Sequence, residues 1–291
     1  MRKQFVKTLQ TILYNDVNTT LLLGDIGVFA FRNEFINIPN RVYNIGILEQ
    51  TMIGVAAGLS KNGLIPFVHT IAPFLVERAY EQLKIDFGYQ KLGGNFISVG
   101  ASYDYAALGC THHCPADILL MTGIPGMEIL IPGNSQELDI LLKTTYNNGN
   151  PTYTRISEDI HTISLDVEYG KANIIKKGTK ATIICYGPLL EAVNEATKNM
   201  DVTVLYYSTI MPFDSKTLAD NFNDIIIVCE PFYVGSTNYL INSALEHKKY
   251  KLHNIGIPRQ FLTNYGIRKE HDTNLRLDCE ALKERFKLCI A

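Results

Sequence analysis

Between Pro39 and Leu59 the chain carries the sequence PNRVYNIGILEQTMIGVAAGL. A β-rich run over 41–45 ends at Gly46, and residues from about 48 to 60 then have a helical pattern. This junction places one carboxylate, that of Glu49, at the start of a helix among apolar neighbours. A partly desolvated carboxylate can share a proton with a ligand near neutral pH, whereas a surface glutamate in the first turn only favours the helix dipole. On spacing alone, the second interpretation is the simpler one.

The rest of the chain alternates short apolar runs with helical patterns. Strands are predicted over 20–23, 41–45, 64–68, 95–99 and 127–132, with an amphipathic helix over 73–88. A polar stretch runs from 147 to 178, and strands are predicted again over 181–187, 202–207 and 224–230. Such alternation is typical of parallel sheets covered on both faces. The predicted fold class is therefore α/β, with two doubly wound, mainly parallel-sheet domains.

Composition narrows the class of protein. The 291 residues have a formal net charge of −2 and are 46% hydrophobic. No basic stripe points to nucleic acid, and no run of 18 apolar residues points to a membrane span. Two of the six cysteines, Cys185 and Cys229, lie in predicted buried strands, as expected for a reducing compartment. We expect a cytoplasmic protein that binds neither nucleic acid nor membrane.

The segment quoted above resembles the motif PxRxxNxGIxEQxMxGxAAGL of the pyrimidine-binding domain of transketolases, deoxyxylulose-phosphate synthases and related thiamine-diphosphate enzymes. In that family the glutamate hydrogen-bonds N1′ of the cofactor's aminopyrimidine, which lets the cofactor act as its own base. The resemblance implies this role for Glu49. It extends along almost the whole chain and implies a pyrimidine-binding domain over 1–160, a linker over 161–178 and a transketolase C-terminal domain over 179–291.

Two further cofactor-binding residues follow from the resemblance. Asp25, after the apolar run 21–23, matches an aspartate near the family's cofactor site. Phe74 matches the aromatic residue that stacks on the pyrimidine, although a phenylalanine is as often buried simply for packing.

The segment Gly109-Cys110-Thr111-His112-His113-Cys114 invites two interpretations. Two cysteines and two histidines suggest zinc, but four ligands within five consecutive residues cannot easily surround one tetrahedral ion. The segment resembles the family's GxTHH or GxTHQ, which implies that His112 faces the substrate as a proton shuttle or hydroxyl ligand, with His113 beside it. A loop histidine bonded to backbone is the alternative.

Arg155 matches an arginine that grips a substrate phosphate or carboxylate in the family, with an ordinary salt bridge as the alternative. The sequence also departs from the family. Leu108 stands where transketolases carry an acidic residue that binds a sugar hydroxyl, and Gly100 falls where they carry a histidine. Tyr103, Asp104 and Tyr105 could replace those contacts, so Asp104 is a candidate substrate ligand.

The chain has no Gly-Asp-Gly motif, through which this family holds Mg²⁺ and the cofactor's diphosphate in another domain. We therefore expect no metal ligands in this chain. The resemblance implies the C-terminal subunit of a split, transketolase-like enzyme that transfers a two-carbon ketol unit between sugar-like substrates. An N-terminal transketolase-like subunit would supply the Mg²⁺ and diphosphate site, in an α2β2 heterotetramer that shares thiamine diphosphate. The alternatives are the β-subunit of a thiamine-dependent 2-oxoacid dehydrogenase and a non-catalytic scaffold subunit.

Overall fold

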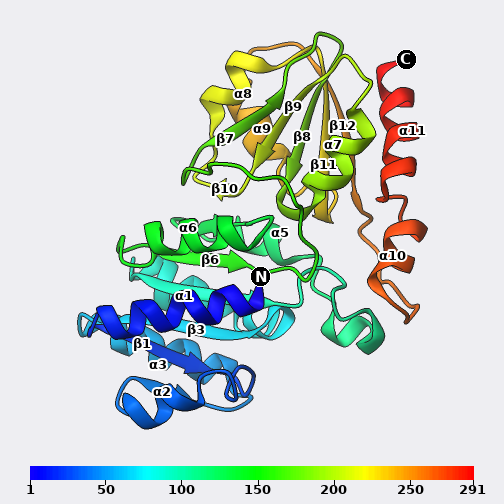
Figure 1. Ribbon diagram of the computed structural model, residues 1–291. Coiled ribbons are helices and arrows are strands. Elements are labelled where there is room, and N and C mark those ends of the chain that lie inside the picture. Colours follow the sequence, from blue (N-terminus) through cyan, green and yellow to red (C-terminus); the bar gives the residue numbers. More distant parts are fainter.

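The computed structural model describes all residues, 1–291, as two α/β units stacked along the long axis of the molecule (Figure 1). The first unit is built on a seven-stranded sheet in the order β10-β5-β6-β4-β3-β1-β2. Its strands are β1 (Thr19–Leu23), β2 (Val42–Asn44), β3 (Ile65–Ile71), β4 (Gly94–Val99), β5 (Glu128–Leu130), β6 (Pro151–Arg155) and β10 (Thr209–Met211). All are parallel except β10, which pairs with β5 in the antiparallel sense.

The second unit is a five-stranded sheet in the order β12-β11-β8-β9-β7. Its strands are β7 (Ala172–Lys176), β8 (Thr182–Tyr186), β9 (Thr203–Tyr207), β11 (Ile225–Tyr233) and β12 (Lys251–Ile257). Only β7, at one edge, is antiparallel to its neighbour. The predicted α/β class with mainly parallel sheets is thus confirmed.

Helices cover both faces of each sheet. Around the first sheet lie α1 (Arg2–Asn15), α2 (Arg32–Asn37), α3 (Glu49–Lys61), α4 (Tyr80–Gln82), α5 (Asp117–Met121) and α6 (Ser135–Thr145), with the short 3₁₀ turns η3 (Ala106–Leu108) and η4 (Cys110–His112). Around the second lie η5 (Gly187–Leu189), α7 (Leu190–Thr197), α8 (Ser215–Asn221), α9 (Asn238–Ala244), α10 (Arg268–Asn274) and α11 (Cys279–Ile290). None of the helices is long and apolar enough to cross a lipid bilayer.

The domain boundary differs from the expected one in two places. Strand β7 lies within 161–178, so that the expected linker contains an edge strand of the second sheet. Strand β10 follows β9 of the second unit in the chain, yet it completes the first sheet. The second unit therefore contributes a strand to the first sheet, and one apolar core runs from Leu22 and Phe96 of the first to Ile184 and Phe232 of the second.

The amphipathic helix expected over 73–88 is not one regular α-helix. It is divided into the π-helix η1 (Phe74–Arg78), the short α4 and a second π-helix, η2 (Leu83–Tyr89). The predicted inner face is nevertheless correct, since Leu75, Ala79, Leu83 and Phe87 are all fully buried. Wide π turns often occur at functional sites, and η1 carries one of the predicted cofactor contacts.

Candidate cofactor site

The predicted cofactor residues gather at one edge of the first sheet. Asp25 comes just after β1, Glu49 after β2 and Phe74 after β3, and these three strands lie side by side in parallel. Ligands of open α/β sheets bind at the carboxyl ends of the strands. The topology therefore brings together three residues that are far apart in the sequence.

Glu49 is the first residue of α3 and is only 1% exposed. Its Oε2 pairs with Nη1 of Arg78 at 2.7 Å, and its Oε1 accepts a hydrogen bond of 3.3 Å from the hydroxyl of Thr70 on β3. Gly24 packs against Thr70 so closely that a Cβ at this position would lie 2.8 Å from the Thr70 hydroxyl oxygen. A buried carboxylate needs such partners, because an unpaired buried charge is costly.

Phe74 is the first residue of η1, and its ring is half-buried. The guanidinium carbon of Arg78 lies 4.3 Å from the centre of this ring, in a cation–π arrangement. On another side the ring meets the imidazole of His112, edge to face, with 5.3 Å between the ring centres. Glu49, Arg78, Phe74 and His112 thus form one continuous line of contacts.

Arg78 was not among the residues expected from the sequence. It lies four positions after Phe74 within the π-helical turn, and its side chain reaches back to a different element, α3. The only sequence signal for it is an arginine four residues after the predicted stacking residue, among other charged residues such as Glu77 and Glu81. That signal does not distinguish a site residue from a solvated one.

Asp25 borders the site on its exposed side. Its backbone is left-handed, with φ of 67°, and its carboxylate accepts a hydrogen bond of 3.2 Å from the amide of Asn44 at the end of β2. The amide oxygen of Asn44 in turn accepts from the backbone N–H of Asp25 at 3.0 Å. These bonds join the ends of β1 and β2 beside Glu49, and the cofactor-binding role of Asp25 stays a prediction.

The two adjacent histidines point to different surroundings. His112 is half-buried between Phe74 and Tyr105, with ring-centre distances of 5.3 and 6.3 Å, and its Nδ1 lies 3.0 Å from the Thr111 hydroxyl. His113 is buried against His271 of α10, 5.6 Å between ring centres, and its Nε2 has no hydrogen-bond partner. Burial lowers the pKa of His113, and the neighbouring His271 lowers it further. Of the two, only His112 adjoins the Glu49 and Phe74 site.

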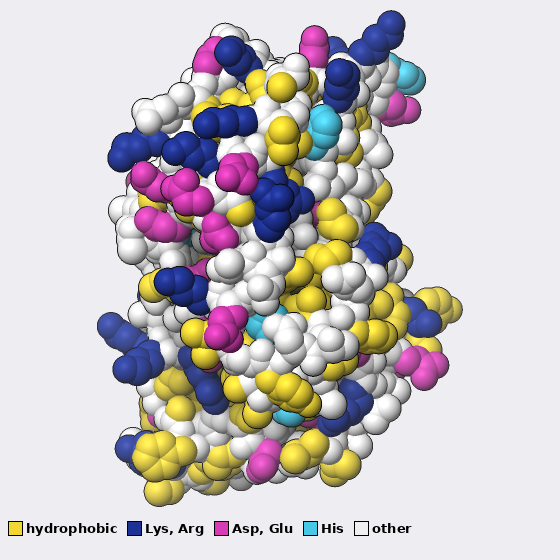
Figure 2. Space-filling view, turned by 90° about the vertical axis from the view of Figure 1, so that its right-hand side faces the viewer, with side chains coloured by type: hydrophobic (Ala, Val, Ile, Leu, Met, Phe, Trp, Pro, Cys, Tyr) yellow, Lys and Arg dark blue, Asp and Glu magenta, His cyan; other side chains and the backbone are white.

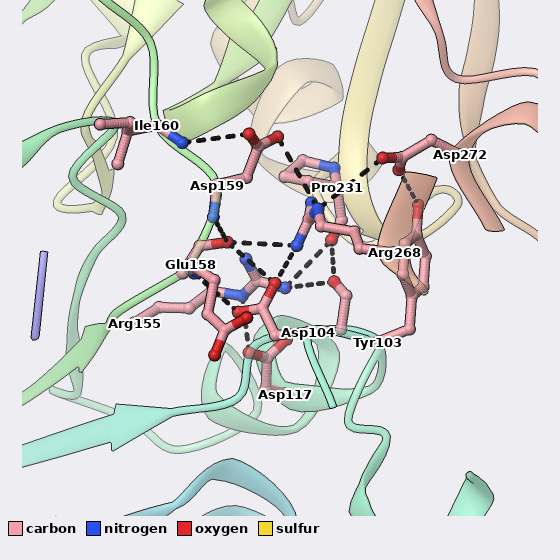
Figure 3. A network of polar contacts seen from close by, with 12 residues as sticks. Tyr103, Asp104, Asp117, Arg155, Glu158, Asp159, Ile160, Pro231, Arg268 and Asp272 are labelled. Carbon is pink, nitrogen blue, oxygen red and sulfur yellow. Dashed lines mark hydrogen bonds and ion pairs between the residues drawn. The ribbon is translucent and has the colours of Figure 1, made fainter. Parts of the chain in front are cut away.

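Arg155 and Asp104, both predicted to hold substrate, lie in a polar network between the two units (Figure 3). Arg155 is 1% exposed; its Nε bonds Asp117 at 2.6 Å, and its Nη2 donates to the Ser102 hydroxyl at 2.5 Å and the Pro231 carbonyl at 3.0 Å. The ion pair kept as an alternative for Arg155 is thus present, but it is internal rather than at the surface.

Asp104 has a similar environment. One carboxylate oxygen accepts from Arg268 and from the Ser157 hydroxyl at 3.2 Å, and the other accepts from the Glu158 backbone N–H at 3.0 Å. Both predicted substrate ligands therefore have their polar partners inside this chain. These contacts link the two units, and the substrate-binding roles of Arg155 and Asp104 stay predictions.

The cysteine and histidine segment forms no metal site. Cys110 is exposed, whereas Cys114 is buried 3.7 Å from the Glu77 carboxylate. No group of three or more histidine, cysteine, aspartate or glutamate side chains is placed to hold a metal ion.

Figure 2 shows the face of the molecule toward which the strands of the first sheet run. Hydrophobic side chains gather over its middle and lower parts, with histidine among them. Apolar residues next to the site residues in the chain, namely Ile47, Leu48 and Leu108, are exposed. Part of the site's rim is therefore apolar and uncovered in this chain.

Residues 1–161 match the family described as "Transketolase, pyrimidine binding domain". An uncharacterized 33.6 kDa protein in the fasciation locus of Rhodococcoides fascians is 37% identical over 285 residues, which cover 96% of this chain and 91% of that protein. A subunit of the apulose-4-phosphate transketolase of Phocaeicola vulgatus is 30% identical, covering 92% of this chain and 94% of that subunit.

A solved structure described as a split gene transketolase, inactive beta4 tetramer, superposes with a TM-score of 0.85 at 22% identity. The superposition covers 99% of this chain and 97% of the solved chain, so that the whole two-unit fold is shared. The chain belongs to the transketolase family, and its first unit is the pyrimidine-binding domain. The resemblance seen in the sequence is confirmed.

Proposed function

We propose that this chain is the C-terminal subunit of a split, thiamine-diphosphate-dependent enzyme that transfers a two-carbon ketol unit between sugar-like substrates. The observation that supports this proposal best is the position of Glu49, a carboxylate 1% exposed at the carboxyl edge of a pyrimidine-domain sheet beside a half-buried phenylalanine. An aminopyrimidine ring can hydrogen-bond such a carboxylate through a ring nitrogen and can stack on such an aromatic face.

The residues present fit the pyrimidine half of the cofactor. Glu49 would hold a proton at N1′, Thr70 would orient its carboxylate, and Phe74 would offer a stacking face. When bound, thiamine diphosphate supplies a carbon nucleophile and an electron sink for the ketol unit. His112, in contact with the Phe74 ring, is placed to exchange a proton with a substrate hydroxyl or to bind it.

The diphosphate half of the cofactor requires another chain in this proposal. The sequence has no Gly-Asp-Gly, and no cluster of acidic, cysteine or histidine side chains could hold Mg²⁺. The relative from Phocaeicola vulgatus, which matches over most of its length, is itself named as one subunit of a transketolase, and this favours a two-chain enzyme. We therefore propose an N-terminal transketolase-like partner that holds Mg²⁺ and the diphosphate, in an α2β2 heterotetramer.

The test is to replace Glu49 in the chain assembled with its partner. Glu49→Gln keeps the size and shape of the side chain but removes the carboxyl group that exchanges a proton with N1′. Turnover of a ketol donor should therefore fall by about a hundredfold or more. Glu81→Gln is the matched control, because Glu81 is an exposed glutamate in the neighbouring helix α4. Turnover is measured as the rate at which the aldehyde product of the donor is released.

Three outcomes separate the candidate functions. Loss of turnover with Glu49→Gln but not with Glu81→Gln supports the proposal. Release of CO₂ from a 2-oxoacid by the wild-type assembly would instead favour a dehydrogenase β-subunit. Unchanged turnover in Glu49→Gln would mean a scaffold role.

A further inference from the structure

A single side chain occupies both recognition surfaces of the proposed pyrimidine pocket. The guanidinium of Arg78 lies 2.7 Å from Oε2 of Glu49, and its carbon atom lies 4.3 Å from the centre of the Phe74 ring. We propose that Arg78 is a latch, which holds Glu49 and the Phe74 ring by these two contacts and leaves both of them when the cofactor binds. This inference rests on the proposed function.

The two contacts compete with the pyrimidine ring. The planar guanidinium covers one face of the Phe74 ring, and a ring that stacks on that face would have to displace it. A nitrogen that hydrogen-bonds Glu49 would compete with the Arg78 donor at 2.7 Å, while Thr70 engages the other oxygen. Arg78 in this position therefore competes with the cofactor's ring for Glu49 and for this face of Phe74.

The latch also gives the buried carboxylate of Glu49 a partner. Glu49 is 1% exposed, and a buried carboxylate with no counter-charge or donor destabilises the fold. Arg78 provides that partner through the ion pair at 2.7 Å. Once the cofactor's ring engages Glu49, the ion pair with Arg78 is no longer required.

Arg78 is free to move without disturbing the core. Its side chain is 39% exposed, and the residues of η1 that are buried, Leu75 and Val76, are different ones. Release therefore breaks a cation–π contact and an ion pair whose carboxylate is buried, and it uncovers no buried apolar surface. It is favourable only where the cofactor's ring takes over as the hydrogen-bond partner of Glu49.

The test measures the affinity of the assembled pair of subunits for thiamine diphosphate with Mg²⁺ by calorimetry. Arg78→Gln should bind the cofactor roughly three- to tenfold more tightly, because no guanidinium has to be displaced first. Arg78→Lys keeps the charge but loses the planar face, so its affinity should fall between those of Arg78→Gln and the wild type. Arg32→Gln is the matched control, since Arg32 lies 4.4 Å from the centre of the Phe29 ring without any carboxylate partner.

Binding kinetics give a second readout that does not depend on turnover. In the wild type the observed binding rate should level off at high cofactor concentration, where opening of the latch limits it, and in Arg78→Gln it should keep rising. Equal or weaker cofactor affinity in Arg78→Gln, with circular dichroism showing a folded chain, would overturn the latch. That failure differs from failure of the proposed function, in which Glu49→Gln leaves turnover unchanged.

Discussion

At the scale of single residues, a buried imidazole links the stability of the fold to pH. His69 on β3 is 1% exposed, packs against the Phe5 ring of α1 with 4.7 Å between ring centres, and has Nδ1 3.0 Å from the Ile97 carbonyl oxygen. Burial lowers its pKa from 6.5 to about 4. The unfolded chain therefore takes up a proton at this residue as the pH falls below 6.5, and the folded chain does not until about pH 4.

We expect the free energy of unfolding to decrease as the pH falls from 6.5 to 4, with a contribution from His69 of about 3 kcal/mol at the lower end. His69→Gln should remove this contribution, so that its stability changes less over the same window. Denaturant unfolding at a series of pH values measures the difference. His247→Gln, which changes an exposed histidine, should follow the wild-type curve. Parallel curves for wild type and His69→Gln would contradict the prediction.

The sequence identifies the residues of the candidate site only where a motif names them. Glu49, Phe74 and His112 follow from the motif and do come together in the structure. Arg78 could not be found in this way, because its contact with Glu49 depends on how η1 turns toward α3. Arg155 matches a family arginine, whereas Asp104 was a candidate only because the sequence departs from the family nearby; both lie in the network between the units, beside Asp117 and Arg268.

At the scale of elements, two glycines should respond in opposite ways to substitution by alanine. Gly24, at the end of β1, faces Thr70 at a distance that no Cβ can adopt, and Gly58 in α3 has nothing within 4 Å of a Cβ position. Gly24→Ala should push Thr70 away from Glu49, cost about 1–3 kcal/mol of stability and weaken cofactor binding by the assembled enzyme. Gly58→Ala should instead stabilise the isolated chain by about 0.5–1 kcal/mol, because alanine favours the helix.

Thermal unfolding of both variants, with cofactor affinity measured for Gly24→Ala, checks this pair. The prediction does not hold if both substitutions shift the melting temperature in the same direction. Of the small residues Gly54, Ala56, Ala57 and Gly58 in α3, only the two alanines are buried, and a Cβ at either glycine would meet no backbone.

The elements that the sequence predicts well are those with a strong apolar pattern. The strands β1, β3, β4, β8, β9 and β11 are nearly continuous apolar runs, as expected for strands covered on both faces. Strand β7 is half-exposed at a sheet edge and β10 has three residues, so neither has a pattern that stands out from a loop. The division of 74–89 into π and α turns leaves the inward face intact, and periodicity alone therefore does not reveal it.

At the scale of the whole molecule, the two units are joined in three ways. Strand β10 crosses from the second unit into the first sheet, an apolar core spans both units, and the network of Figure 3 links them through polar contacts. In that network Arg268 of α10 pairs with Asp104 and lies over the Tyr103 ring, whose hydroxyl donates to Asp272 at 2.5 Å. Contacts between residues so distant in the sequence cannot be predicted from local sequence patterns. For this reason the sequence predicts the two units but not the contacts that join them.

These connections predict that the chain unfolds in one transition, although proteins with two domains often unfold in steps. Arg268→Ala leaves the carboxylate of Asp104 buried without its counter-charge, which should cost about 3–5 kcal/mol. Because β10 and the shared core remain, the melting curve should shift to lower temperature without splitting. Adding Asp104→Asn to Arg268→Ala should recover part of the loss, since the uncompensated charge is then removed. Calorimetry of the wild type and both variants measures this. Two resolved transitions in Arg268→Ala would show instead that the ionic network alone holds the units together.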